Sequence, residues 1–413
     1  MDRYAAAKIR GFGTSVFSEM SRLAQQHGAV NLGQGFPDFP GPQFVKDAAK
    51  QAIDADKNQY AISHGAPRLR QAIAATWERD HGRAIDPDAE VTVTSGATEA
   101  VFAALQAFLG QGDEVILFEP FYDSYLPSAL LAGGGAKVVT LRPPDWAFDP
   151  DELRAAFGPR TRAILLNTPH NPTGKVFTRD ELGQIAALCQ ERDVLAITDE
   201  VYDRITFDGA EHVSLATLPG MWERTLTINS TGKSFSMTGW KIGYAVGPAS
   251  LNAALRAVHQ FVTFASATPF QEAMATALES ARGLGYYPQL RAEYAMRRSL
   301  LRDTLHDAGL RTLPIGGSYF LMADITPFGF ANDVAFCRAL TERARVAALP
   351  PSAFYLDPSR APQLARFCFA KRAETLNAAA ARLAAGARRP ARPAAPRGGG
   401  RLGRRRSRPG RGC

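Results

Sequence analysis

Short apolar runs alternate with helical patterns along the first two thirds of the chain. Five of these runs read as strands, at residues 91–93, 115–118, 163–166, 194–198 and 225–229. Strands that are mainly apolar have to be covered on both faces, so they are typical of a parallel sheet between two layers of helices. The sequence therefore predicts an α/β fold.

Helix signals lie between these runs. Residues 98–109 form an amphipathic pattern that ends at Gly110. Thr178 and Glu181 have the spacing of a capping box, in which each residue bonds the other's backbone, and apolar residues follow at helical spacing. Both segments are predicted to be helices that cover the sheet.

The pattern changes after about Tyr286. A long charged helix is predicted over residues 288–308, followed by an apolar strand at 318–323, another helix and a strand at 366–369. We interpret this region as a second, smaller α+β unit.

The basic character of the chain comes from its last segment. The net charge is +8, but residues 386–413 hold ten arginines and no acidic residue, and the remainder has 38 basic and 40 acidic residues, a net charge of −2. Residues 386–413 are rich in Arg, Pro, Gly and Ala, and we expect them to be disordered. An arginine-rich anion-binding tail is the alternative to an incidental extension. A nucleic-acid partner is not expected, although a nucleic-acid-binding protein with a vestigial enzyme domain remains the rival from another class.

Other features of the sequence indicate where the protein is located and which kinds of site it lacks. No run approaches the ~18 apolar residues that a membrane-spanning helix needs. The first ten residues carry charges where a signal peptide has its apolar core, so a cytoplasmic location is expected. The four cysteines are far apart in the sequence and lack metal-ligand spacing, so we expect neither a metal site nor structural disulfides.

Polar residues follow all five predicted strands. In an open α/β sheet, ligands bind beyond the carboxyl ends of the strands, so these residues are predicted to meet at one edge. Taken singly, each has a simpler explanation: residues 95–98 are suited to cap a helix, Asp199 to form a turn, and Tyr122 to fill a core. Their convergence favours a site. The segments are Ser95–Thr98, Glu119–Asp123, Asn167–Gly174, Asp199–Tyr202 and Ser230–Lys233.

Lys233 is the candidate nucleophile at this edge of the sheet. It lies among small and hydroxyl-bearing residues, and a second cation, Lys241, follows eight residues later. Neutral surroundings and a nearby positive charge lower the pKa of a lysine and make its amine nucleophilic, as Schiff-base chemistry requires. An anion-binding helix start, an acid, a phenol, an amide and an amine together suit a phosphorylated pyridine aldehyde.

Several motifs resemble one enzyme family. Residues 230–243 (STGKSFSMTGWKIG) are similar to the lysine signature of class I, fold type I pyridoxal-phosphate aminotransferases. The kynurenine aminotransferase, glutamine transaminase K and methionine aminotransferase branch is indicated by five further segments: NLGQGFPDFP (31–40), NQY (58–60), NPTG (171–174), DEVY (199–202) and RFCF (366–369). The resemblance runs from about residue 10 to residue 385.

The resemblance implies roles for the residues that handle the cofactor, pyridoxal 5′-phosphate. Lys233 forms the Schiff base and then moves the substrate proton. Asp199 keeps the ring nitrogen protonated. Tyr202 and Asn171 hydrogen-bond the ring oxygen, and Tyr122 stacks on the ring.

It also implies which residues bind the cofactor phosphate and the substrate. The phosphate is expected to be held by Gly96, Ala97, Thr98, Ser230 and Lys241, with Tyr60 reaching the cofactor of the partner subunit in a homodimer. Arg366 is expected to bind the substrate α-carboxylate, with Gly35 and Asn171 beside it.

The same resemblance implies the domain organisation and the reaction. The expected division is an N-terminal arm with part of the small domain (1–45), a large domain with a mainly parallel seven-stranded sheet (46–285), and a smaller α+β domain (286–385). We predict ping-pong transfer of the amino group from methionine, glutamine, an aromatic amino acid or a kynurenine-like one to a 2-oxo acid. A cysteine-S-conjugate β-lyase and another biosynthetic transaminase, of the succinyl-diaminopimelate type, are the alternatives.

Overall fold

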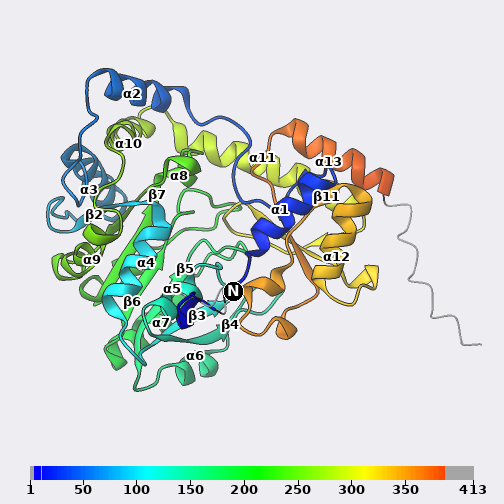
Figure 1. The fold of residues 1–413 in the computed structure, drawn as a ribbon, viewed down its shortest axis with the longest axis horizontal. Helices are drawn as coiled ribbons and strands as arrows, with labels where there is room; N and C mark the ends of the chain where they lie inside the picture. The colour runs from blue at the N-terminus through cyan, green and yellow to red at the C-terminus, as the bar shows by residue number, and fades with distance from the viewer. Residues whose placement is uncertain (1–3, 11, 387–413) are drawn as a thin grey trace, which may run out of the picture.

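The computed structural model describes residues 4–10 and 12–386. The predicted disordered tail lies outside the described residues apart from Gly386, which ends helix α13 (Ala373–Gly386). Figure 1 shows two parts side by side, a large domain built on a central sheet and a smaller domain that carries α13. In the described part of the chain, no helix is long and apolar enough to cross a membrane.

A seven-stranded sheet forms the centre of the large domain. Its strand order is β2-β8-β7-β6-β5-β3-β4, and within it β8 runs antiparallel to both neighbours while the other pairs are parallel. The mainly parallel α/β sheet predicted from the sequence is thus confirmed. The strands are β2 (Val91–Ser95), β3 (Glu114–Glu119), β4 (Gly135–Thr140), β5 (Thr161–Asn167), β6 (Leu195–Asp199), β7 (Thr225–Ser230) and β8 (Ile242–Val246).

Helices cover both faces of this sheet, as the apolar strands require. Successive residues of a strand face opposite sides. Ile116 of β3 packs in one core with Leu182 of α7, and Leu117 packs in another with Leu105 of α4. The helices of this domain are α2 (Gln43–Asp54), α3 (Pro67–His81), α4 (Gly96–Phe108), α5 (Tyr125–Leu131), α6 (Pro150–Ala156), α7 (Arg179–Arg192), α8 (Thr231–Ser234), α9 (Ala249–Val262) and α10 (Thr268–Ala281).

Local sequence signals set where several of these elements begin. The capping box predicted at Thr178 and Glu181 is present at the start of α7. Strands β4 and β8 were not predicted. Strand β4 lies at the sheet edge and is half-exposed, and β8 contains Gly243, a residue type that is rare in strands.

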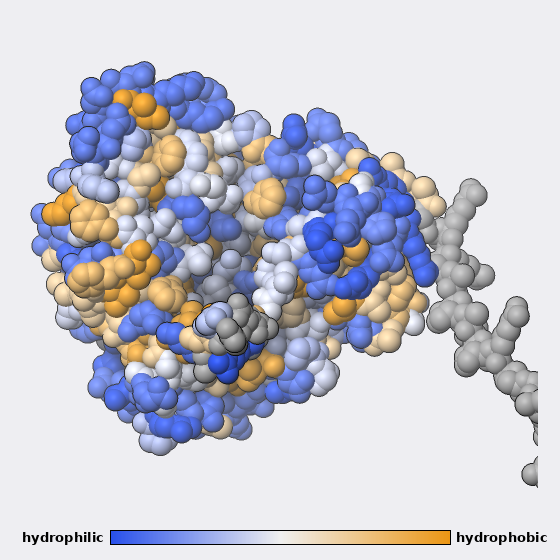
Figure 2. Space-filling model, viewed as in Figure 1, coloured by the Kyte–Doolittle hydropathy of each residue, from blue (hydrophilic) through white to orange (hydrophobic). Residues whose placement is uncertain are grey.

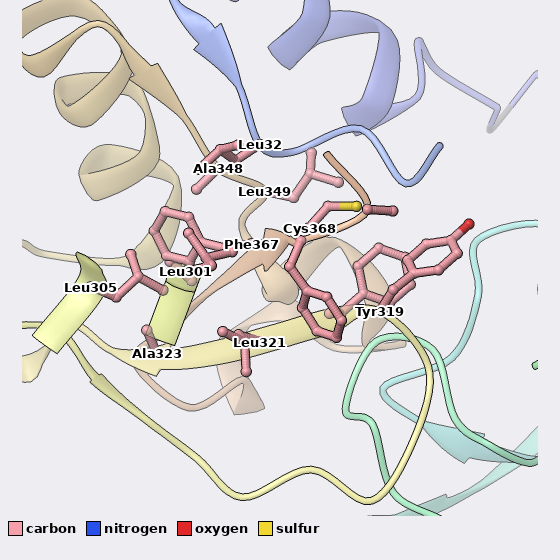
Figure 3. Close-up of a cluster of buried hydrophobic side chains, with 14 of the residues drawn as sticks. Leu32, Leu301, Leu305, Tyr319, Leu321, Ala323, Ala348, Leu349, Phe367 and Cys368 are labelled. Carbon is pink, nitrogen blue, oxygen red and sulfur yellow. The ribbon is translucent and has the colours of Figure 1, made fainter. Parts of the chain in front are cut away.

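The small domain is built from an N-terminal segment, which contains α1 and β1, and from the elements that follow α10. Strand β1 from the N-terminal segment pairs in parallel with β11, and a second sheet has the antiparallel order β12-β10-β9. In Figure 3, Leu32 lies in the same apolar cluster as Leu301 and Phe367. The elements are α1 (Val16–Gln26), β1 (Val30–Asn31), α11 (Tyr286–Asp307), β9 (Arg311–Thr312), β10 (Phe320–Asp324), α12 (Asp333–Ala339), β11 (Val346–Ala347), β12 (Leu364–Cys368) and α13.

Candidate active site

A cavity of about 250 Å³ lies where the carboxyl ends of the parallel strands meet. Figure 2 shows the surface hollowed between the two domains on this side of the molecule. Strands β2, β3, β5, β6 and β7 run in the same direction, so the segments that follow them converge, as predicted. The cavity lining includes Gly96, Ala97, Thr98, Tyr122, Asn171, Asp199, Tyr202, Ser230, Lys233 and Lys241.

The start of helix α4 forms one end of the cavity. The first N–H groups of a helix have no acceptor within it and attract anions. Gly96 has φ +78°, and a Cβ there would come within 3.0 Å of the Lys241 Nζ. A Cβ at Gly243 would come within 2.5 Å of the Ala97 nitrogen. Glycine at both positions therefore lets the ammonium group and the β8 backbone approach these amides, which makes an anion-binding cup.

Lys233 lies on the short helix α8, whose first turn is capped by the side chain of Ser230. The pKa of Lys233 is lowered to about 8, mainly by burial and to a smaller extent by the charge of Lys241, while Asp199 opposes the change. The Lys233 Nζ donates to the Tyr319 hydroxyl (3.1 Å), which donates to the Gly35 carbonyl (2.7 Å). This relay orients an amine that is uncharged in roughly a tenth of the molecules at pH 7, a far larger share than for an ordinary lysine.

Asp199 is the last residue of β6 and is buried. Burial raises its pKa, and this rise is opposed by hydrogen bonds that stabilise the carboxylate. The Tyr125 hydroxyl donates to Oδ2 (2.6 Å) and the Val201 N–H donates to Oδ1 (3.3 Å). The positive charge of Lys233 also lowers the pKa of Asp199. A buried carboxylate held in this way is suited to bind a cationic N–H group.

Two tyrosines line the cavity between these groups. The Tyr202 ring centroid lies 5.6 Å from the Lys233 Nζ, and the Tyr202 hydroxyl is hydrogen-bonded to Tyr319. Burial, followed by the charge of Asp123, raises the pKa of Tyr122 to about 12, while a hydrogen bond with Thr98 opposes the rise. Both phenols therefore remain protonated donors at neutral pH.

Arg366 connects the small domain to the cavity. Its Nη1 donates to Asn171 Oδ1 (2.8 Å) and its Nη2 to the Gly33 carbonyl (2.9 Å). A guanidinium has donors only, so this bond fixes the Asn171 amide with its oxygen toward Arg366. The Asn171 nitrogen is then free to donate to a ligand in the cavity.

Aromatic rings surround this guanidinium. Its central carbon lies 4.1 Å from the Phe320 centroid, 5.2 Å from Phe354 and 5.3 Å from Phe17. We refer to these three rings as the aromatic sheath. Burial lowers the pKa of Arg366 to about 10, so it remains charged, and its buried Nε has no hydrogen-bond partner among the described residues. Such a group is suited to bind a planar carboxylate.

Three predicted residues do not line the cavity: Gly35, Tyr60 and Arg366, the last of which is connected to it through Asn171. Gly35 is linked to it through Tyr319, and a Cβ there would come within 2.8 Å of the Phe320 ring. Tyr60 is 83% exposed and contacts the Phe264 ring at a centroid distance of 5.3 Å, outside the cavity of its own chain.

Sequence reasoning missed Tyr125, Tyr319 and Phe17. Tyr125 follows Tyr122 by three residues, in the polar segment after β3, and could have been included on that basis. Tyr319 and Phe17 belong to the small domain and the N-terminal helix, and no local signal points to the cavity.

The lining fits a phosphorylated pyridine aldehyde. The cup at α4 suits a phosphate, Lys233 suits an aldehyde, and Asp199 suits a protonated ring nitrogen. Any side chain at Gly96 would fill the cup. The three kinds of group line one cavity, so a single ligand can contact all of them.

Comparison with known proteins identifies the family. Residues 27–383 match the family model described as "Aminotransferase class I and II". The chain belongs to this family. The aminotransferase is 42% identical to methionine aminotransferase of Escherichia coli (91% of this chain, 97% of the relative) and 41% identical to kynurenine–oxoglutarate transaminase 1 of Homo sapiens (90% and 96%).

Solved structures agree with the fold of this aminotransferase. N-succinyldiaminopimelate aminotransferase from Mycobacterium tuberculosis is 45% identical and superposes with a TM-score of 0.89, over 92% of this chain and 99% of that one. The expected branch and fold type I architecture are thus confirmed. The enzyme is a pyridoxal 5′-phosphate-dependent aminotransferase, as the sequence predicted.

Proposed function

We propose that this aminotransferase acts on L-amino acids with uncharged sulfur-containing, amide or aromatic side chains, such as methionine, glutamine, phenylalanine or kynurenine. The amino group passes to a 2-oxo acid in a ping-pong reaction. The observation that carries this proposal is the aromatic sheath around Arg366. Rings next to the carboxylate-binding group favour apolar and aromatic substrate side chains.

The charges near the substrate end support the same choice. Among the described residues of the cavity lining, the cations are Lys233 and Lys241, both assigned to the cofactor. Asp123 is half-buried, and burial raises its pKa while Arg366 lowers it, so the two charges lie close enough to interact. A carboxylate at this end repels a second substrate carboxylate.

Lys233 is assigned the proton transfer. Bound pyridoxal phosphate supplies the aldehyde that takes up the amino group and a ring that accepts the electrons of the substrate α-carbon. With the cofactor bound, the amine of Lys233, whose pKa is about 8, would take the proton from the substrate α-carbon and would deliver the same proton to the carbon that the aldehyde supplied. The Tyr319 hydroxyl holds this amine in position.

The other predicted site residues are assigned to binding and orientation. Asp199, held by Tyr125, binds the ring nitrogen in its protonated form. Tyr202 and the Asn171 amide nitrogen donate to the ring oxygen, and Tyr122 stacks on the ring. The phosphate lies in the cup of Gly96, Ala97, Thr98, Ser230 and Lys241. Arg366 binds the α-carboxylate, with Gly35 and Asn171 beside it.

A homodimer is part of this proposal. Tyr60 faces away from its own cavity, and apolar side chains near it in the chain and in space are also exposed: Ile62, Phe261, Val262 and Phe264. Exposed apolar residues gathered on one face are typical of protein–protein interfaces. In the dimer, Tyr60 reaches the phosphate of the cofactor in the partner subunit.

Substrate profiling tests the proposal. Adding L-methionine alone to the holoenzyme is expected to bleach the visible band of the cofactor and to release one oxo acid per site. A higher rate with aspartate than with methionine contradicts the proposed substrate class. Pyruvate and ammonia formed from a cysteine conjugate without an acceptor indicate a β-lyase instead.

A second candidate is transamination of N-succinyl-diaminopimelate, because the similarity to the M. tuberculosis enzyme is as strong as any reported above. That substrate carries additional carboxylates, which the charges near Arg366 disfavour. A kcat/KM for it that exceeds the value for methionine supports this second candidate.

A further inference from the structure

A buried pair of charged side chains lies directly behind the anion-binding cup. Glu99 is in the first turns of α4, and one of its carboxylate oxygens accepts from the Ser95 N–H at the start of that helix. The other oxygen, Oε1, is 2.6 Å from the Nδ1 of His259 on α9. Both side chains are almost fully buried, at 6% and 0% exposure. Neither side chain lines the cavity.

The hydrogen bonds of His259 are those of an imidazolium opposite an ionised Glu99. Its second nitrogen, Nε2, is 2.7 Å from the carbonyl oxygen of Ser63. With Glu99 ionised, both partners are acceptors, so both ring nitrogens carry hydrogens and the ring is an imidazolium. Burial lowers the pKa of His259, but the hydrogen bond and charge of Glu99 outweigh burial and raise the pKa above 6.5.

The position of Glu99 creates an electrostatic problem for phosphate binding. Its carboxylate lies on the same helix end as Gly96, Ala97 and Thr98, whose amides form the cup. A buried negative charge there repels a phosphate dianion, and burial leaves this repulsion poorly screened. The same carboxylate is nevertheless useful, because it binds the Ser95 N–H and helps to hold the helix start in place.

We propose that His259 is a positioning residue that neutralises Glu99, so that the first turn of α4 can be braced by a carboxylate and still bind a dianionic phosphate. This inference rests on the phosphate cup of the proposed function. Through Ser63, the same ring also holds the loop that carries Tyr60. The other charged or titratable groups that face His259 are Arg256, one turn earlier on α9, and His64.

Equilibrium binding of pyridoxal phosphate to the apoenzyme, followed by absorbance, tests the proposal. His259→Gln is expected to weaken binding by about tenfold, because it leaves the Glu99 charge uncompensated. The double variant E99Q/H259Q removes that charge and is expected to recover most of the loss. The matched control is His306→Gln, an exposed histidine that contacts Thr312, and it should change nothing.

The affinity of the double variant distinguishes neutralisation of Glu99 from a purely structural role of His259. If His259 acts only through packing, the two substitutions add, and the double variant binds more weakly than H259Q. That result overturns the proposal. Lys241→Met tests the phosphate cup itself. If K241M binds pyridoxal phosphate as tightly as the wild type, the proposed cup is wrong. If K241M binds it more weakly and H259Q does not, only the proposed role of His259 is wrong.

A measurement on the wild-type fold covers the case in which H259Q does not fold. Sulfate is a tetrahedral dianion that does not titrate in the working range, so it serves as the probe. As the pH rises from about 6.5 through the pKa of His259, the imidazolium is lost and sulfate affinity for the apoenzyme should fall. The fall should be several-fold larger in the wild type than in E99Q, which has no charge to neutralise. Equal falls in the two proteins overturn the proposal.

Discussion

The two ends of the active site are built in different ways. The cofactor end consists of segments that directly follow strands of one sheet, so each residue is fixed by the strand before it. The substrate end joins parts that are distant in sequence: Gly33 and Arg366 share a hydrogen bond, as do Gly35 and Tyr319. The first end is therefore rigidly specified by local sequence, and the second depends on how the small domain packs.

This difference predicts that the chemistry and the substrate choice are separable. Substitutions at the sheet edge should change the reaction itself for every substrate. Substitutions around Arg366 should change which amino acids are used and leave the cofactor in place. The predictions below test that division.

The largest effect is expected for Lys233→Ala. Loss of the amine that carries the proton should lower the rate of amino-group transfer by roughly a thousandfold or more, equally for methionine and phenylalanine. The phosphate cup is untouched, so sulfate affinity of the apoenzyme should be unchanged. Single-turnover absorbance measurements check the rate, and a loss confined to one amino acid would contradict the assignment.

Arg366→Lys is expected to have the next largest effect. A point charge cannot replace a bidentate guanidinium, so kcat/KM for the amino acid should fall about 100-fold. The dissociation constant of pyridoxal phosphate should stay within about threefold of the wild-type value. Steady-state kinetics and cofactor titration on the same preparation decide the matter, and an equal loss in both would break the proposed division.

Tyr125→Phe should lower kcat by up to about tenfold and alter its pH dependence. The Tyr125 hydroxyl stabilises the Asp199 carboxylate, so its removal raises the pKa of Asp199 further above the ordinary range. Asp199 has to be ionised to bind a protonated ring nitrogen, so activity should be lost at a higher pH on the acid side. An unshifted acid limb of the kcat profile would argue against this role.

Phe17→Leu is expected to have the smallest effect. It removes one ring of the aromatic sheath from a half-buried position on α1, so kcat/KM for phenylalanine should fall by about threefold relative to alanine. Competition between the two amino acids measures this ratio directly. Phe330→Leu, a half-buried residue of the small domain that packs on Phe336 outside the sheath, is the control for loss of an aromatic ring.

The sequence predicted the cofactor end far better than the substrate end. Lys233, Asp199 and Asn171 each stand next to an apolar strand whose direction and burial follow from a simple pattern. Tyr319 and Phe17 could not be found in this way, because their contacts with Lys233 and Arg366 depend on how the start of β10 and helix α1 pack in the folded chain. The resemblance supplied Arg366, which spacing alone did not. The domain limits, the Tyr60 contact across a dimer and the cytoplasmic location stay predictions.

The Arg366–Asn171 hydrogen bond has a consequence for how this enzyme can diversify. One amide serves the carboxylate-binding arginine with its oxygen and the cofactor with its nitrogen. A change at Asn171 is therefore penalised at both ends of the site, and this residue offers no gradual route to new substrates. Divergence, natural or engineered, is easier at Phe17, which packs on Arg366 from a half-buried position on α1 and takes no part in the hydrogen bond of the shared amide.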